Sequence, residues 1–248
     1  MTTLVLGIAD GVKAAGPLIA LVALALVVIP RSRQRALATT SIAILVAWYA
    51  VVYVFAEAGA FKVAGPAGIP MLAVAFIPAL AGLLFILLSG PVRRLLTEPG
   101  VPAGVIAVQT YRLVGGSFLL LFAIHRLPAI FAILAGGGDM LVGATAWAVA
   151  NAVRNGRLAR GVIWNLLGLL DLVVAVSLGV AFSPQFHLSP DGVTTAALTV
   201  LPNVLVPAFL VPVSILLHVA SLRSLRALSA TAAHRDRPRR EAFAVGGR

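Results

Sequence analysis

The sequence predicts an all-α, polytopic integral membrane protein folded as a bundle of seven transmembrane helices. Sixty per cent of its 248 residues are hydrophobic and eleven per cent are charged, whereas charged residues make up about 25% of an ordinary soluble domain. Its mean hydropathy is +1.05, and its apolar runs approach or exceed the roughly 20 residues that cross a bilayer as a helix. Basic residues gather in the short connections between these runs, as they do in membrane proteins.

The first three helices are predicted at residues 14–30, 37–55 and 70–88. The preceding residues include Asp10 and Lys13 but lack the basic n-region and the small-residue cleavage site of a signal peptide, so the first run is expected to remain as a helix. It ends at a cluster of arginines that is typical of a stop-transfer signal. Aromatic residues near the end of the second helix suit a membrane interface, and a Gly-Pro pair follows the third.

The fourth and fifth helices are predicted at residues 103–125 and 128–153, which are divided by a short polar connection. An alternative partition gives the fourth helix residues 113–135, which would bring Arg112 to the inner interface and make the Gly-Gly-Gly-Asp run an outer loop. That partition leaves only residues 140–153 for the fifth helix, fewer than the roughly 17 residues that a span needs. The first partition is therefore preferred.

The sixth and seventh helices are predicted at residues 161–182 and 195–222. Arginines precede the sixth helix, a polar connection follows it, and prolines interrupt the seventh. Residues 1–228 are therefore expected to form a single transmembrane domain. The remaining segment, residues 229–248, is basic and has too little apolar content to pack, so we expect a disordered cytoplasmic tail.

The distribution of basic residues predicts the orientation of the chain. Fifteen of the nineteen lysines and arginines follow the first, third, fifth and seventh helices. Positive residues mark the cytoplasmic side, so the N-terminus is expected outside and the C-terminus inside the cytoplasmic (inner) membrane of a bacterium. The net charge of +11 therefore indicates topology and contact with membrane lipid, and no nucleic acid is expected as a partner.

Three charged residues inside the predicted helices form what we call the charged layer: Arg112, Asp139 and Asp171. At about 1.5 Å per residue, each lies roughly 15 Å from one end of its helix, near the middle of a core about 30 Å thick. A charge in hydrocarbon costs several kcal/mol unless it is paired or hydrated, so Arg112 and Asp171 are predicted to lie within ion-pair distance. Gln109 and Asn165 are polar neighbours on the same two helices and join the layer as candidates.

A run of three glycines, Gly136, Gly137 and Gly138, precedes Asp139 at membrane depth. Glycines weaken a helix, and irregular backbone in a bilayer is tolerated only where protein or a water-filled cavity covers it. A break here would start a half-helix near Asp139, whose free N–H groups suit an anionic ligand and whose preceding carbonyls suit a cation. The alternative is an intact helix in which the glycines permit a tight helix crossing.

Several functions do not fit the composition and spacing of the chain. It has no cysteine and no HExxH or GxSxG motif, so no catalytic residue, metal or cofactor is assigned and an enzymatic role is not expected. His125 and His218 are predicted near opposite interfaces, too far apart to share a haem. Lys13 and Lys62 are assigned outside the helix cores, which leaves no lysine for a Schiff base on the seventh helix.

The charged layer predicts a small-solute or proton-coupled transporter, with a small anionic solute or a proton as its partner. The alternative is a non-transporting scaffold or ligand sensor in which the buried charges only hold the bundle together, because buried ion pairs can specify packing without doing chemistry. The candidate binding residues are Arg112, Asp139, Asp171, Gln109, Asn165, Gly136, Gly137 and Gly138.

Overall fold

The computed structural model describes residues 2–62, 71–186 and 188–245, and the regular elements in these residues are all helical. Six of the described helices are long and apolar enough to cross a membrane, or seven if the bent pair α3–α4 counts as one span. The prediction of an all-α, multi-pass membrane protein is therefore confirmed. The side of the membrane that the N-terminus faces stays a prediction.

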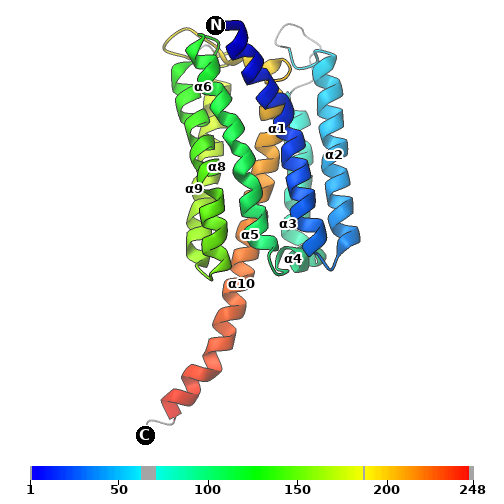
Figure 1. The fold of residues 1–248 in the computed structure, drawn as a ribbon, viewed down its shortest axis with the longest axis vertical. Helices are drawn as coiled ribbons and strands as arrows, with labels where there is room; N and C mark the ends of the chain where they lie inside the picture. Colours follow the sequence, from blue (N-terminus) through cyan, green and yellow to red (C-terminus); the bar gives the residue numbers. More distant parts are fainter. Residues whose placement is uncertain (1, 63–70, 187, 246–248) are drawn as a thin grey trace.

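The elements follow one another as an almost uninterrupted series of helices (Figure 1). Two of the predicted spans consist of three consecutive helical segments each. In chain order the elements are α1 (Thr2–Arg31), α2 (Arg35–Glu57), α3 (Met71–Leu88), α4 (Gly90–Leu96), α5 (Val101–Val108), η1 (Gln109–Gly115), α6 (Gly116–Ala123), α7 (Ala129–Phe131), η2 (Ala132–Gly136), α8 (Gly137–Arg154), α9 (Leu158–Ala181), η3 (Thr195–Thr199), η4 (Val206–Leu210) and α10 (Val211–Val245).

Two spans form the centre of the bundle. In Figure 1 the N-terminus lies at one end of the bundle, and α10 leaves from the other. The most apolar stretch is 67% buried in the α5–η1–α6 span and 78% buried in the η4–α10 span, against 17% in α2. Most of the inward-facing side chains of these two spans are therefore enclosed by protein, and a polar group enclosed there must find its partners within the bundle.

The first helix begins earlier than predicted, and this corrects the placement of Lys13. The side chain of Lys13 is fully buried, donates a hydrogen bond to the Asn203 side-chain oxygen, and lies 5.7 Å from the centroid of the Phe118 ring. A lysine can be held inside a bundle when its ammonium has such partners. The assignment of Lys13 to a lead outside the helix cores is therefore wrong.

The last span also differs from its prediction. It begins at Val206 in place of residue 195, because residues 200–204 form a bend and turns around Pro202 and Pro207 lies at the start of η4, where a missing N–H is harmless. At the other end, α10 continues past residue 222 to Val245 and extends beyond the bundle (Figure 1). The composition predicts disorder for residues 229–248, but the structure continues the helix to Val245, since extending a helix that is already formed is less costly than starting one.

A short helix was not predicted between the third and fourth spans. The helix α4 follows α3 at an angle of 83°, and it lies at the end of the bundle from which α10 extends (Figure 1). The side chain of Ser89 caps it by accepting a hydrogen bond from the backbone N–H of Val92 at 3.4 Å, a usual role of serine at a helix start. The apolar side of α4 is buried, whereas Arg93 and Arg94 are exposed.

Candidate functional site

Arg112 lies at the centre of the charged layer. It sits on η1, a turn of 3-10 helix in the middle of the fourth predicted span, and is 2% exposed. Its Nε donates a hydrogen bond to Oδ1 of Asp139 at 2.6 Å, and its Nη2 forms an ion pair with the same oxygen at 2.6 Å. Nη2 also donates to Oδ2 of Asp171. The predicted Arg112–Asp171 ion pair is therefore confirmed, and Asp139 is a second partner of the same guanidinium.

The remaining edge of the guanidinium faces a histidine. Nη1 of Arg112 lies 3.0 Å from Nε2 of His218 and 3.5 Å from the carbonyl oxygen of Gly168. Because arginine can only donate, Nε2 of His218 is the acceptor and the ring proton sits on Nδ1. Nδ1 then donates to the side-chain oxygen of Asn165 at 2.9 Å. His218 is thus held as the neutral imidazole.

Asn165 and Gln109 reach the charged layer through this ring. The amide nitrogen of Asn165 donates to the carbonyl oxygen of Gly161 and to the hydroxyl of Ser221. The amide nitrogen of Gln109 lies 3.2 Å from Nδ1 of His218, while its Oε1 is buried without a partner in the described chain. Turning this amide over would present Oε1 to the ring N–H. Both predicted residues therefore lie beside His218, and the described structure has no hydrogen bond from either of them to Arg112.

His218 is the main residue that the sequence-based prediction missed. The arginines after residue 222 predict a helix end there and put His218 about a turn from the inner interface, whereas the candidate span runs from Val206 to Thr231 and has His218 near its middle. The side chain is fully buried, and its ring lies 5.3 Å from that of Trp164. One signal was available: Ser214, His218 and Ser221 recur at helical spacing and mark a polar face on an otherwise apolar helix.

The glycine run does not break the helix. Residues 132–136 form a turn of π-helix, η2, which continues directly into α8 from Gly137. The predicted half-helix at Asp139 is therefore wrong, and the alternative of a tight crossing holds. A Cβ on Gly138 would collide with Oδ1 of Asp171, and one on Gly115 would collide with Asp139. The absence of a side chain at these two positions lets α8 approach both neighbouring spans closely enough to bring the charges together.

This packing makes a prediction about two adjacent glycines. Gly138→Ala should lower the free energy of unfolding by about 1–3 kcal/mol, because overpacking forces backbone or side-chain shifts. Gly137→Ala is the matched control, since a Cβ there meets nothing within 4 Å and alanine favours a helix by up to about 1 kcal/mol. Thermal unfolding of the purified protein in detergent measures both. Equal stability of the two variants would contradict the close approach.

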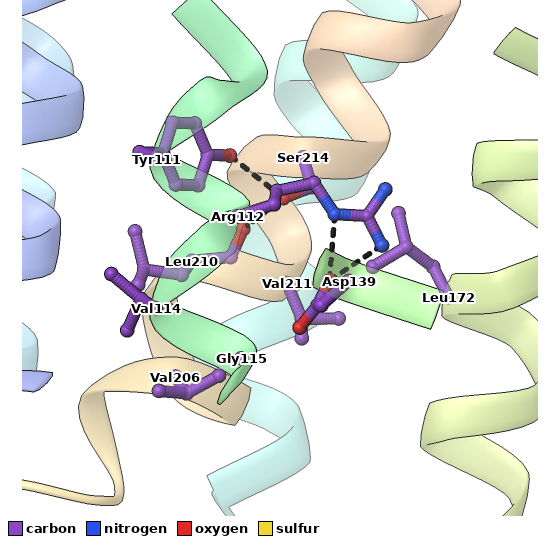
Figure 2. Close-up of a pocket in the computed structure, with 10 residues that line it drawn as sticks. All are labelled: Tyr111, Arg112, Val114, Gly115, Asp139, Leu172, Val206, Leu210, Val211 and Ser214. Carbon is purple, nitrogen blue, oxygen red and sulfur yellow. Dashed lines mark hydrogen bonds and ion pairs between the residues drawn. The ribbon is translucent and has the colours of Figure 1, made fainter. Parts of the chain in front are cut away.

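Asp139 differs from Asp171 in what surrounds it. Asp139 lies at one end of a cavity of about 400 Å³, which we call the main cavity, and Asp171 does not line it. Arg112 binds Oδ1 of Asp139, and the other oxygen, Oδ2, has no hydrogen-bond partner among the described residues. Figure 2 shows this second oxygen turned away from Arg112. Oδ1 of Asp139 is therefore bound to Arg112, and Oδ2 is left to bind another group.

A smaller void adjoins the same carboxylate. It measures about 10 Å³ and is lined by Tyr111, Arg112, Gly115 and Asp139, among others (Figure 2). This is about the least space that holds one water molecule. The Tyr111 hydroxyl beside it is hydrogen-bonded to Ser214 at 2.7 Å. A water here would contact the charged layer without displacing any of its ion pairs.

The formal charges of the layer do not cancel. Arg112 contributes one positive charge, the two aspartates contribute two negative charges when ionised, and His218 is neutral, which leaves the layer at minus one. The next buried cation, Lys13, is hydrogen-bonded to Asn203 and lies against the ring of Phe118. An uncompensated charge at membrane depth is costly. The layer can be neutralised by a proton on one carboxylate or by a bound cation.

A comparison with known protein families identifies the family of this chain. The model of a family described as "Domain of unknown function (DUF8737)" matches residues 69–226. The chain belongs to this family. The matched part begins just before α3 and contains Arg112, Asp139, Asp171 and His218, whereas Lys13 lies outside it. The searches of the curated proteins and of the solved structures found no match. The family description assigns no activity, so a function must be argued from the site.

Proposed function

We propose that this member of the DUF8737 family is a proton-coupled transporter of a small solute, in which Asp139 binds and releases the proton. One observation carries the proposal: Asp139 is the ion-pair partner of Arg112 through Oδ1 and also borders the main cavity, with Oδ2 unpartnered among the described residues. A carboxylate that exchanges protons needs both features. The ion pair stabilises its charged form, and the cavity gives a proton a path to it.

Protonation of Asp139 would change the forces that hold three helices together. The ionised carboxylate attracts Arg112, and the neutral acid does so much less strongly. Asp171 would keep Arg112 neutralised while Asp139 is protonated, so the layer would pass from a charge of minus one to zero. The glycine contacts make the crossing of α8 with its neighbours sensitive to small shifts. Proton binding could thus alter the packing of α8, which a transporter needs in order to alternate between states.

The proposed topology determines which side of the membrane the main cavity faces. The chain passes through the connections at residues 58–62 and 182–186 at the end of the bundle where the N-terminus lies (Figure 1), and both contribute to the far end of the main cavity from Asp139. With the N-terminus outside, as the arginine clusters favour, Asp139 would communicate with the exterior of a bacterial cytoplasmic membrane. We propose this state as the outward-facing one.

Cysteine labelling tests this orientation, because the native chain has no cysteine. Gln185 and Ser229 are both exposed and lie at opposite ends of the bundle. Gln185→Cys should react with a membrane-impermeant maleimide on intact cells, and Ser229→Cys should react only after the membrane is permeabilised. The reverse pattern would invert the topology and place the cavity on the cytoplasmic side.

Infrared spectroscopy of the protein reconstituted in lipid tests the proton site directly. Acidification should produce a C=O stretching band of a protonated carboxylic acid, and that band should be absent from Asp139→Asn. In proteoliposomes that enclose a pH-sensitive dye, a solute gradient should then drive proton movement above that of empty vesicles. A protein without the Asp139 band has no proton site of the kind proposed.

The alternative function, a scaffold or sensor without transport, is favoured by a different observation. Every side of the Arg112 guanidinium has a partner: Asp139, Asp171, His218 and the carbonyl oxygen of Gly168. A saturated buried network can hold helices in register without any chemistry. The infrared measurement separates the two functions, since a purely structural Asp139 would stay ionised and paired over the range in which the protein is folded.

A further inference from the structure

We propose that the main cavity binds a lipophilic organic cation, with the cationic centre at Oδ2 of Asp139 and the apolar body in the cavity. This inference rests on the proposed function and names its solute class. The volume of about 400 Å³ lies within the range of about 300–1,000 Å³ that is common for sites of drug-sized ligands. The cavity is therefore large enough for an organic molecule and much larger than a proton path requires.

The lining of the cavity is apolar and aromatic along most of its length. Phenylalanine side chains from five parts of the chain contribute to it, and two of them, Phe118 and Phe131, lie with ring centroids 5.4 Å apart. Aromatic faces attract organic cations, because the ring carries negative charge density on its face. The phenylalanines of the lining are Phe61, Phe76, Phe118, Phe131 and Phe186.

The charges around the cavity favour a cation over an anion. Asp139 is the charged residue at its inner end, in a layer whose formal charge is minus one. An anion at this end would meet the like charge of the free Oδ2, since Arg112 is already bound to both carboxylates. The sequence predicts a small anionic solute from Arg112 and from a half-helix starting near Asp139. The helix is continuous there and Arg112 does not line the main cavity, so we propose a cation in its place.

Two amines lie near the cavity, and neither is bonded to Asp139 in the described part of the chain. Lys62 lines the far end, and its side chain folds back over its own turn, where a Cβ on Gly59 would lie 3.3–3.4 Å from its Cδ, Cε and Nζ atoms. The ammonium of Lys13 is bound to Asn203 and lies against the ring of Phe118. Neither amine is a partner of Asp139, so its unpartnered oxygen remains the point where a ligand cation is neutralised.

A proton and a lipophilic cation would then compete for Asp139. Both neutralise the layer, so binding of one disfavours binding of the other. Cation binding should therefore weaken as the pH falls and Asp139 takes up a proton. The other ionisable side chains near Asp139 are Arg112, Asp171 and Tyr111, with a neutral His218 beyond Arg112 and Lys62 in the lining of the same cavity. Exchange of one cation for one proton would be charge-balanced.

Two probes of the same shape and opposite charge test the ligand class. Tetraphenylphosphonium and tetraphenylborate are titrated into the full-length protein in lipid nanodiscs, with empty nanodiscs as the blank for partition into lipid. At alkaline pH the wild type should bind the phosphonium at least tenfold more tightly than the borate, after correction for the blank. Equal binding of the two ions, or tighter binding of the borate, would overturn the proposal.

Three variants locate the binding in the cavity. Asp139→Asn should weaken phosphonium binding at least tenfold and abolish its pH dependence. Ala175→Phe, which fills the lining without changing any charge, should weaken it similarly. Glu57→Gln, which removes an exposed carboxylate outside the lining, should leave it unchanged. If Asp139→Asn does not fold, the Ala175→Phe variant and the pair of probes decide, and unchanged binding in Ala175→Phe would refute the assignment.

The outcomes also separate this inference from the proposed function. An infrared band of protonated Asp139 without phosphonium binding would refute the lipophilic cation as the ligand and keep the proton site. Phosphonium binding that depends on Asp139, in a protein that shows no such band, would support the ligand class and refute proton coupling. Loss of both would leave the scaffold function as the better account.

Discussion

Replacement of Arg112 by alanine is expected to lower the free energy of unfolding by about 3–5 kcal/mol, the range seen when one partner of a buried ion pair is removed. Arg112 is 2% exposed and neutralises two carboxylates at once. Its loss would leave both Asp139 and Asp171 without a counter-charge at the centre of the bundle. Chemical or thermal unfolding in mixed micelles, followed by helical circular dichroism, measures the effect.

A mutant cycle shows whether this loss comes from the ion pairs. Asp171→Ala in the Arg112→Ala background removes one of the two stranded carboxylates and should recover part of the lost stability. The two substitutions should therefore be non-additive, with a coupling energy in the range of about 0.5–3 kcal/mol that is usual for contacting residues. Strictly additive effects would mean that the contacts between Arg112 and Asp171 contribute nothing to folding.

The depth of the charged layer could be predicted from the sequence. Counting residues from the ends of each apolar run placed Arg112, Asp139 and Asp171 at one level, and the cost of an unpaired charge in hydrocarbon required them to meet. The structure confirms that they do. The prediction that they meet succeeded because most of each span is α-helical, with a rise of about 1.5 Å per residue, so that counting residues from a helix end gives a distance along its axis.

The same reasoning failed for two other polar residues. Lys13 and His218 were treated as signs of a helix end, and both are fully buried in the middle of longer helices. Their partners are Asn203 for Lys13, and Arg112 and Asn165 for His218, and these lie far away in the sequence. A single residue cannot reveal whether a distant side chain compensates its polarity. A polar residue in the sequence therefore predicts the end of a helix less reliably than residue counting predicts the level of a side chain along its span.

The glycine run shows a second limit. Three adjacent glycines are compatible with a broken helix and with a tight crossing, since the lack of a side chain permits both. Only the neighbours decide, and here they are the Asp171 carboxylate beside Gly138 and the Gly115 backbone oxygen, 2.9 Å from a Cβ placed on Gly136. The main cavity was equally beyond prediction, because its lining comes from residues spread between Ala60 and Val211.

The two aspartates are expected to respond in opposite ways to replacement by asparagine. Their side chains are almost equally exposed, at 14% for Asp139 and 13% for Asp171, so burial alone does not distinguish them. Both pack tightly against a glycine, Asp139 against Gly115 and Asp171 against Gly138. Of the two, Asp139 lines the main cavity. We therefore assign proton exchange to Asp139 and a structural role to Asp171.

Asp139→Asn should keep the fold, and its rate of solute-driven proton movement in proteoliposomes should be at least tenfold lower. Its amide oxygen can still accept from Arg112 at the position of Oδ1, and Asp171 still neutralises the guanidinium, but an amide cannot exchange a proton. Asp171→Asn should retain the proton movement, because Asp139 remains, and should lower the free energy of unfolding by about 1–3 kcal/mol through the weakened bond to Arg112. Full activity in Asp139→Asn, or loss of activity in a stable Asp171→Asn, would remove Asp139 from the proposed role.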